Sequence, residues 1–89
     1  MARAWEADAS VSFRRRLGKS PQELGVTEDK TGCPDIWELG NGDVAVIGRD
    51  LTEAYKSRLP ADVSIAHDER LIVIPGSVLR AAKPDITDA

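Results

Sequence analysis

The chain has 89 residues, of which 42% are hydrophobic and 30% charged, and its 12 basic and 15 acidic side chains give a net charge of −3. This length leaves room for one domain, which buries only about 60% of its unfolded surface and so has a thin margin of stability. The residues after position 30 carry six basic and ten acidic side chains. That balance disfavours nucleic acid as the partner of the folded part.

The single cysteine, Cys33, excludes an intramolecular disulfide and a cysteine-based zinc site. No apolar stretch approaches the roughly 18 to 20 residues of a membrane span, and charged residues stand where a secretory signal has its apolar run. We therefore expect a cytoplasmic protein with no membrane contact, no metal and no cofactor.

Residues 1–32 show little sustained periodicity, because their few apolar side chains are scattered among small, basic and acidic ones. We expect a flexible basic arm there. Within it, Ser20, Pro21 and Glu23 have the spacing of an N-cap, a first helical proline and a capping-box glutamate. This pattern predicts one turn of helix, which Gly25 ends.

Two β-prone runs at residues 35–39 and 44–47 flank Asn41-Gly42. This dipeptide is typical of type I′ hairpins, which need positive φ at both central positions. A two-residue loop fixes the register, because it places the residues on either side of it opposite each other. The expected pairs are Gly40 with Asp43, Leu39 with Val44, Glu38 with Ala45 and Trp37 with Val46.

This register assigns the two faces of the hairpin. The face that we expect to join the core carries Trp37, Leu39, Val44 and Val46. The opposite face is mixed enough to be partly covered or to form a contact surface, and it carries Ile36, Glu38, Ala45 and Ile47.

After the hairpin, Asp50 and Glu53 form an N-terminal cap pattern before apolar residues at helical spacing. The pattern predicts a short helix over about residues 51–59, which Pro60 ends. A run at residues 63–65 and a more apolar run at residues 70–74 predict two further strands, the second of them buried on both faces.

A final short helix is expected from Ser77 to about Lys83. The compact domain then spans residues 33–84 and is followed by an acidic tail at residues 85–89. The fold class is α+β, a small sheet of β-hairpins with two short helices in the order ββα-ββ-α after the flexible arm.

No motif in the sequence points to catalysis, and we expect no catalytic residue. Gly18-Lys19-Ser20 lacks the earlier glycine and the leading strand of a phosphate-binding loop. His67, the only histidine, stands in a polar turn typical of a solvated side chain. An enzyme would need a pocket that gathers His67, Cys33 and carboxylates.

The strongest signals of interaction lie in the arm and in the hairpin. Three consecutive guanidinium groups can contact phosphates or a carboxylate surface, although they also suit a solvated arm. Trp37 suits either the core or an exposed binding anchor. The candidate interaction residues are Arg14, Arg15, Arg16, Ile36, Trp37 and Ile47.

The stretch CPDIWEL at residues 33–39, followed by NGDVAVIGRDLT at residues 41–52, resembles a group of short uncharacterised proteins from actinobacteria such as Streptomyces. These tend to be encoded beside helix-turn-helix regulators. The resemblance covers about residues 33–84 and implies a regulatory or accessory role without a catalytic residue to carry over.

A shorter stretch, DERLIVIP at residues 68–75 followed by Leu79-Arg80, is similar to the strand-proline-helix element of AbrB-type transition-state regulators. Those proteins bind DNA as strand-swapped dimers. The acidic balance of residues 33–84 weighs against the DNA-binding function that this resemblance implies.

We therefore expect a non-enzymatic regulatory or accessory protein that acts through a protein partner or as a homodimer, using a hairpin face or an open sheet edge. A DNA-binding transcriptional regulator of AbrB type is the first alternative. A small enzyme or enzyme subunit is the second, and the scattered positions of Cys33 and His67 disfavour it.

Overall fold

The computed structural model describes residues 5–25 and 34–86. In these residues a three-stranded antiparallel sheet has the order β1-β2-β3, and β4 and β5 form a separate two-stranded ribbon. The protein belongs to the α+β class, as its sequence predicts. The elements are β1 (Phe13–Arg16), β2 (Asp35–Leu39), β3 (Val44–Ile47), β4 (Arg49–Asp50), α1 (Thr52–Tyr55), β5 (Ile72–Val73), α2 (Gly76–Ala82) and the 3-10 helix η1 (Lys83–Asp85).

Strand β1 lies within the region predicted to be a flexible arm. Its residues pair with β2 in antiparallel orientation, with an irregularity between Phe13 and Arg15. Leu17 follows the strand, donates its N–H to the carbonyl of Ile36 at 2.9 Å and is buried. The arm prediction is therefore wrong for residues 13–17. The edge of β2 provides their backbone hydrogen-bond partners, and the apolar pattern of the sequence does not indicate such pairing.

The hairpin forms at Asn41-Gly42, but its register differs by one residue from the prediction. Trp37 lies opposite Ala45, so the loop contains three residues, 40–42. Gly42 has a φ of 89°, whereas Asn41 keeps a negative φ. A type I′ turn needs positive φ at both positions, and a three-residue loop that ends in a left-handed glycine needs it at only one.

The change of register alters which residues of β2 share a face with which residues of β3, because neighbouring residues of a strand point to opposite sides. Ile36 now shares a face with Val44 and Val46 and lies in the core with 4% of its surface exposed. Trp37 and Leu39 point to the other face. The predicted core face is therefore wrong, and Ile36 is a core residue rather than a contact residue.

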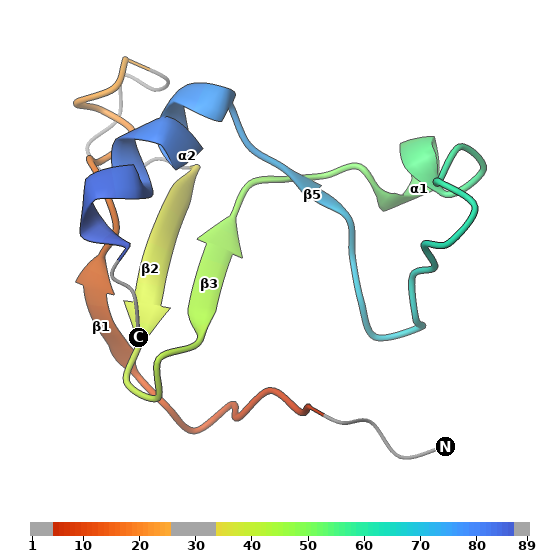
Figure 1. Ribbon diagram of the computed structural model, residues 1–89, viewed down its shortest axis with the longest axis horizontal. Coiled ribbons are helices and arrows are strands. Elements are labelled where there is room, and N and C mark those ends of the chain that lie inside the picture. Colours follow the sequence, from red (N-terminus) through yellow and green to blue (C-terminus); the bar gives the residue numbers. More distant parts are fainter. Residues whose placement is uncertain (1–4, 26–33, 87–89) are drawn as a thin grey trace.

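The core is small and lies between the sheet and α2, which crosses one face of it (Figure 1). Among the described residues, the buried hydrophobic side chains are Leu17, Ile36, Val78 and Ala82, with Leu24 and Ile74 packed against them. The beginning, middle and end of the chain all contribute to this cluster. A core of this size leaves many apolar side chains outside it.

The predicted capping box at Ser20 is confirmed in its hydrogen bonds. The N–H of Glu23 donates to the Ser20 hydroxyl at 3.2 Å, and the N–H of Ser20 donates to the Glu23 carboxylate at 3.2 Å. Only one turn follows, closed by the N–H of Leu24 on the carbonyl of Ser20, and Gly25 ends it with a φ of 71°. The turn brings Leu24 to the core.

Residues 48–74, which we call the excursion, depart most from the expectations. The helix predicted to reach Leu59 is the single turn α1, and residues 63–65 form no strand. The predicted doubly buried strand is the two-residue β5, and both of its side chains are exposed. Figure 1 shows the reason, since the excursion extends away from the sheet and no helix or strand of the described residues forms a second layer over it.

The final helix lies close to its predicted position. It runs from Gly76 to Ala82, and its N-cap residue is Pro75 rather than a serine. Pro84 does not end the helical conformation at once. It stands near the start of η1, where the backbone N–H that proline lacks would have no partner within the helix.

Gly18 brings β1 and α2 into contact through their backbones. It has a φ of 83°, and a Cβ there would lie 2.8 Å from backbone atoms of Ala81 and Ala82. We predict that Gly18→Ala lowers the free energy of unfolding by roughly 3 kcal/mol, because displacement of α2 adds to the strain of a left-handed alanine. Gly42→Ala is the matched control, since its Cβ has open space, and it lowers the same quantity by about 1 kcal/mol. Equal losses in urea unfolding would contradict the contact.

The capping box also predicts a pH response. The Ser20 hydroxyl, and then the Ser20 N–H, hold the pKa of the Glu23 carboxyl below its ordinary value. The stabilisation is therefore complete above the unfolded pKa and is lost as the pH falls through the folded pKa. In an NMR titration, Ser20→Ala should raise the pKa of Glu23 towards the value measured in the urea-denatured chain. An unchanged pKa in that variant would contradict the capping box.

Candidate interaction surfaces

The face of the sheet turned away from α2 carries a row of aromatic and apolar side chains, which we call the aromatic face. The rings of Phe13 and Trp37 lie 5.6 Å apart between centroids at an interplanar angle of 50°. The guanidinium carbon of Arg16 lies 4.7 Å from the centroid of the Trp37 ring. Phe13 is 61% exposed and Ile47 46%. This geometry is typical of aromatic pairing and of a cation over an aromatic ring.

Asp35 fixes the position of Arg16 on this face. The Nη2 atom of Arg16 lies 2.9 Å from Oδ2 of Asp35, and its Nε donates to both carboxylate oxygens at 3.0 Å. The Asp35 side chain is only 7% exposed and also accepts the N–H of Ile36. The charge of Arg16 is therefore compensated, and the aromatic face is apolar rather than basic.

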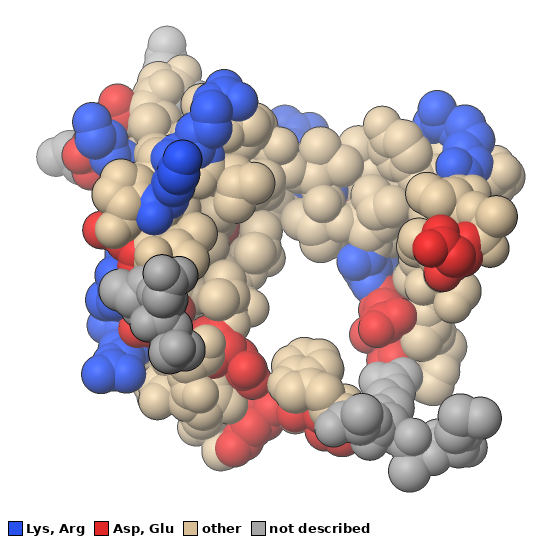
Figure 2. Space-filling view, in the orientation of Figure 1, with Lys and Arg blue, Asp and Glu red and all other residues tan. Residues whose placement is uncertain are grey.

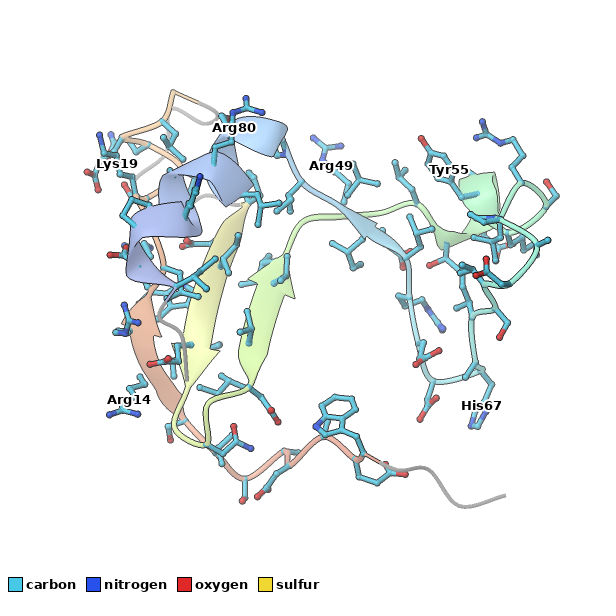
Figure 3. All side chains as sticks on the ribbon, viewed as in Figure 1. Arg14, Lys19, Arg49, Tyr55, His67 and Arg80 are labelled. Carbon is cyan, nitrogen blue, oxygen red and sulfur yellow. The ribbon has the colours of Figure 1, made fainter. Side chains whose placement is uncertain are left out.

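The other two arginines of the triplet do not join this face. Arg15 donates to Glu38 at 3.1 Å and to the carbonyl of Asp85 at 2.8 Å, so it ties η1 to the sheet. Arg14 projects from the outer side of β1 (Figure 3), is 64% exposed and lies 4.0 Å from Glu38. The sequence triplet is thus divided among three environments and does not form one basic patch.

A second surface lies on the opposite face of the sheet, between β3 and α2. There an apolar groove encloses about 290 Å³. Val44, Val46 and Leu79 contribute to it although each is more than 40% exposed. The apolar groove is lined chiefly by Ile36, Val44, Val46, Ile74, Leu79 and Ile86.

Two carboxylate side chains, Glu38 and Asp85, also line the apolar groove. Arg15 holds Glu38, and the N–H of Gly18 donates to the Asp85 carboxylate at 2.7 Å. The volume lies at the small end of ligand pockets, which hold about 300 to 1,000 Å³. The groove therefore suits one or two apolar side chains, with two carboxylates beside them. The sequence could not reveal it, because its walls come from distant segments.

The remaining sequence candidates lie apart from these surfaces. His67 is exposed on the excursion, far from the sheet (Figure 3), and Cys33 lies outside the described residues. No group of three potential metal ligands occurs in residues 5–25 and 34–86. Within the same residues no helix combines the length and apolar character needed to cross a bilayer.

Comparison of the chain with protein-family models, with curated proteins and with solved structures finds no match. The functional argument therefore depends on the geometry of the two surfaces.

The ion pair beneath the aromatic face predicts unequal effects of removing neighbouring arginines. Arg16→Ala leaves the buried Asp35 without its charged partner and should lower the free energy of unfolding by about 2 kcal/mol, less than for a fully buried pair because Arg16 is 36% exposed. Arg14→Ala is the control and should change it by less than about 0.5 kcal/mol. Chemical denaturation measures both, and equal effects would contradict a structural role for the Arg16–Asp35 pair.

Proposed function

We propose that this chain is a non-enzymatic regulatory or accessory protein of the cytoplasm that binds a protein partner with its aromatic face. The observation that carries the proposal is the row of Phe13, Trp37 and Ile47, in which Phe13 and Ile47 are exposed and Arg16 is stacked on the half-buried tryptophan. Three of the residues expected from sequence to make contacts, Arg16, Trp37 and Ile47, belong to this row.

The chemistry of the row supports a protein surface as the partner. Tryptophan and arginine are enriched among the residues that dominate binding energy at protein interfaces. Asp35 compensates the charge of Arg16, so an apolar patch fits this face better than a polyanion does. Phe13 and Ile47 are both more than 40% exposed, and neighbouring exposed apolar side chains on a small domain are typical of an interaction site.

DNA binding receives little support from the same residues. Two of the three consecutive guanidinium groups already have carboxylate partners, Arg15 with Glu38 and Arg16 with Asp35. Only Arg14 is mostly exposed. A single mostly exposed guanidinium, which itself lies 4.0 Å from Glu38, supplies little of the counterion release on which phosphate-backbone binding depends.

The proposal can be tested by photo-crosslinking in the cells that produce the protein. A photoreactive phenylalanine at position 13 should crosslink to a discrete protein, which mass spectrometry identifies. Ile47→Glu should abolish that crosslink, because it places a charge in the apolar contact. Val46→Glu is the matched control, since it has similar exposure on the same strand but faces the apolar groove, and it should preserve the crosslink. A crosslink that survives Ile47→Glu, or none at all, would contradict binding through this face.

A further inference from the structure

The excursion has no core of its own. None of the residues 48–74 is buried, and no described element makes extensive contact with α1. Tyr55, Val63, Ile72 and Val73 are all at least 36% exposed. Ordering a residue costs about 1 to 2 kcal/mol of backbone entropy, which burial of apolar surface normally offsets. The excursion therefore lacks the burial that would stabilise it within one chain.

The base of the excursion is closed by backbone hydrogen bonds between its two connecting segments, and its tip lies away from the apolar groove of its own chain. Arg49 pairs with Val73 and Asp50 with Ile72, and the N–H of Leu51 donates to the carbonyl of Leu71 at 3.0 Å. At Gly48 the two connecting segments touch, since a Cβ there would lie 2.6 Å from the Val73 oxygen. Figure 2 shows an opening through the molecule between the sheet and the excursion.

The dimensions of the chain show the same lack of burial. Its radius of gyration is 14.6 Å, against about 12 Å for a compact chain of this length. It exposes 7101 Å², against about 5,100 Å² for a compact monomer. Each protomer of a permanent homodimer buries about 1,000 to 2,500 Å². The exposed residues that precede β1 contribute to the excess together with the excursion, and its total of roughly 2,000 Å² falls in that range.

The tip of the excursion and the apolar groove are chemically complementary. The tip has an aromatic ring and a cation, and the groove has an apolar space and carboxylates. Tyr55 is an exposed aromatic side chain, and the guanidinium of Arg58 lies 4.5 Å from the centroid of its ring. Arg58 has no ion pair among the described residues. The groove offers about 290 Å³ of mainly apolar space, with Glu38 and Asp85 in its lining. A carboxylate accepts more than one donor, so Glu38 and Asp85 can each accept a further hydrogen bond from a cation.

We infer that two copies of this chain exchange their excursions. Tyr55 of one copy enters the apolar groove of the other, and Arg58 comes next to Glu38 and Asp85 of that copy. The exchange is reciprocal, so both grooves are filled by one two-fold operation and the assembly closes at two chains. The aromatic face lies on the other side of the sheet and stays open for the proposed protein partner.

Size-exclusion chromatography with light scattering tests the inference on the full chain. The unmodified protein should have twice the mass of one chain at micromolar concentration. Val46→Glu in the groove and Tyr55→Lys on the excursion should each raise the dimer dissociation constant by about 100-fold or more, because each buries a charge in an apolar contact. Leu79→Glu places a charge in the groove from the side of α2 and should have the same effect as Val46→Glu. The result therefore does not depend on one variant remaining folded.

Mixing the two variants distinguishes exchange from other dimers. An equimolar mixture of Val46→Glu and Tyr55→Lys contains heterodimers with one native contact and one contact that joins the new glutamate to the new lysine. We expect the dimer to reappear in the mixture although each variant alone is monomeric. A groove that packed against a second groove would be insensitive to Tyr55→Lys, and mixing would restore nothing.

Two matched controls separate this inference from the proposed function. Ile47→Glu has similar exposure to Val46 but lies on the aromatic face, and Ser57→Lys places a lysine on the excursion at an already exposed polar site. Both should keep the dimer, with unchanged circular dichroism. A monomeric unmodified protein, an open-ended series of larger assemblies, or a mixture that stays monomeric would overturn the exchange. None of these results bears on crosslinking through Phe13.

Discussion

The close approach of Leu17 and Gly18 to α2 is the contact on which the rest of the structure depends. Leu17 extends the pairing of β1 with β2 and enters the core, and Gly18 follows with its backbone against Ala81 and Ala82. A side chain at Gly18 would separate the sheet from the helix. This one contact joins the beginning of the chain to its end, and Arg15 and Asp85 reinforce it with hydrogen bonds.

A core built around that contact is too small to cover both faces of the sheet. α2 buries Ile36 on one side but leaves Val44 and Val46 exposed at the rim of the apolar groove. No described helix covers the other side, where Phe13 and Trp37 pair. Short chains bury a smaller fraction of their surface, so apolar area that one copy cannot cover is available for binding. We see the two surfaces as a consequence of that limit.

Local signals in the sequence predicted local structure at Ser20 and at Asn41-Gly42, whereas the helical spacing after Asp50 gave only the single turn α1. The capping box at Ser20 depends on side chains three residues apart, and its hydrogen bonds form as expected. Asn41-Gly42 correctly marked the hairpin, but the choice between a two-residue and a three-residue loop depends on small differences in backbone conformation. That choice moved Ile36 into the core and Trp37 out of it, so one residue of register changed which face carries the candidate site.

The sequence by itself determined the α+β class, the hairpin, the turn at Ser20 and the approximate position of the last helix, because each depends on residues close together in the chain. Only the tertiary structure decided that Phe13–Arg16 is a strand, that Arg15 and Arg16 bind Glu38 and Asp35, and that the excursion lacks a core. These features depend on partners distant in sequence, whose hydrogen bonds and burial no local pattern specifies. The arginine triplet, which reads as one basic segment along the chain, is divided by the bulged pairing of β1 with β2.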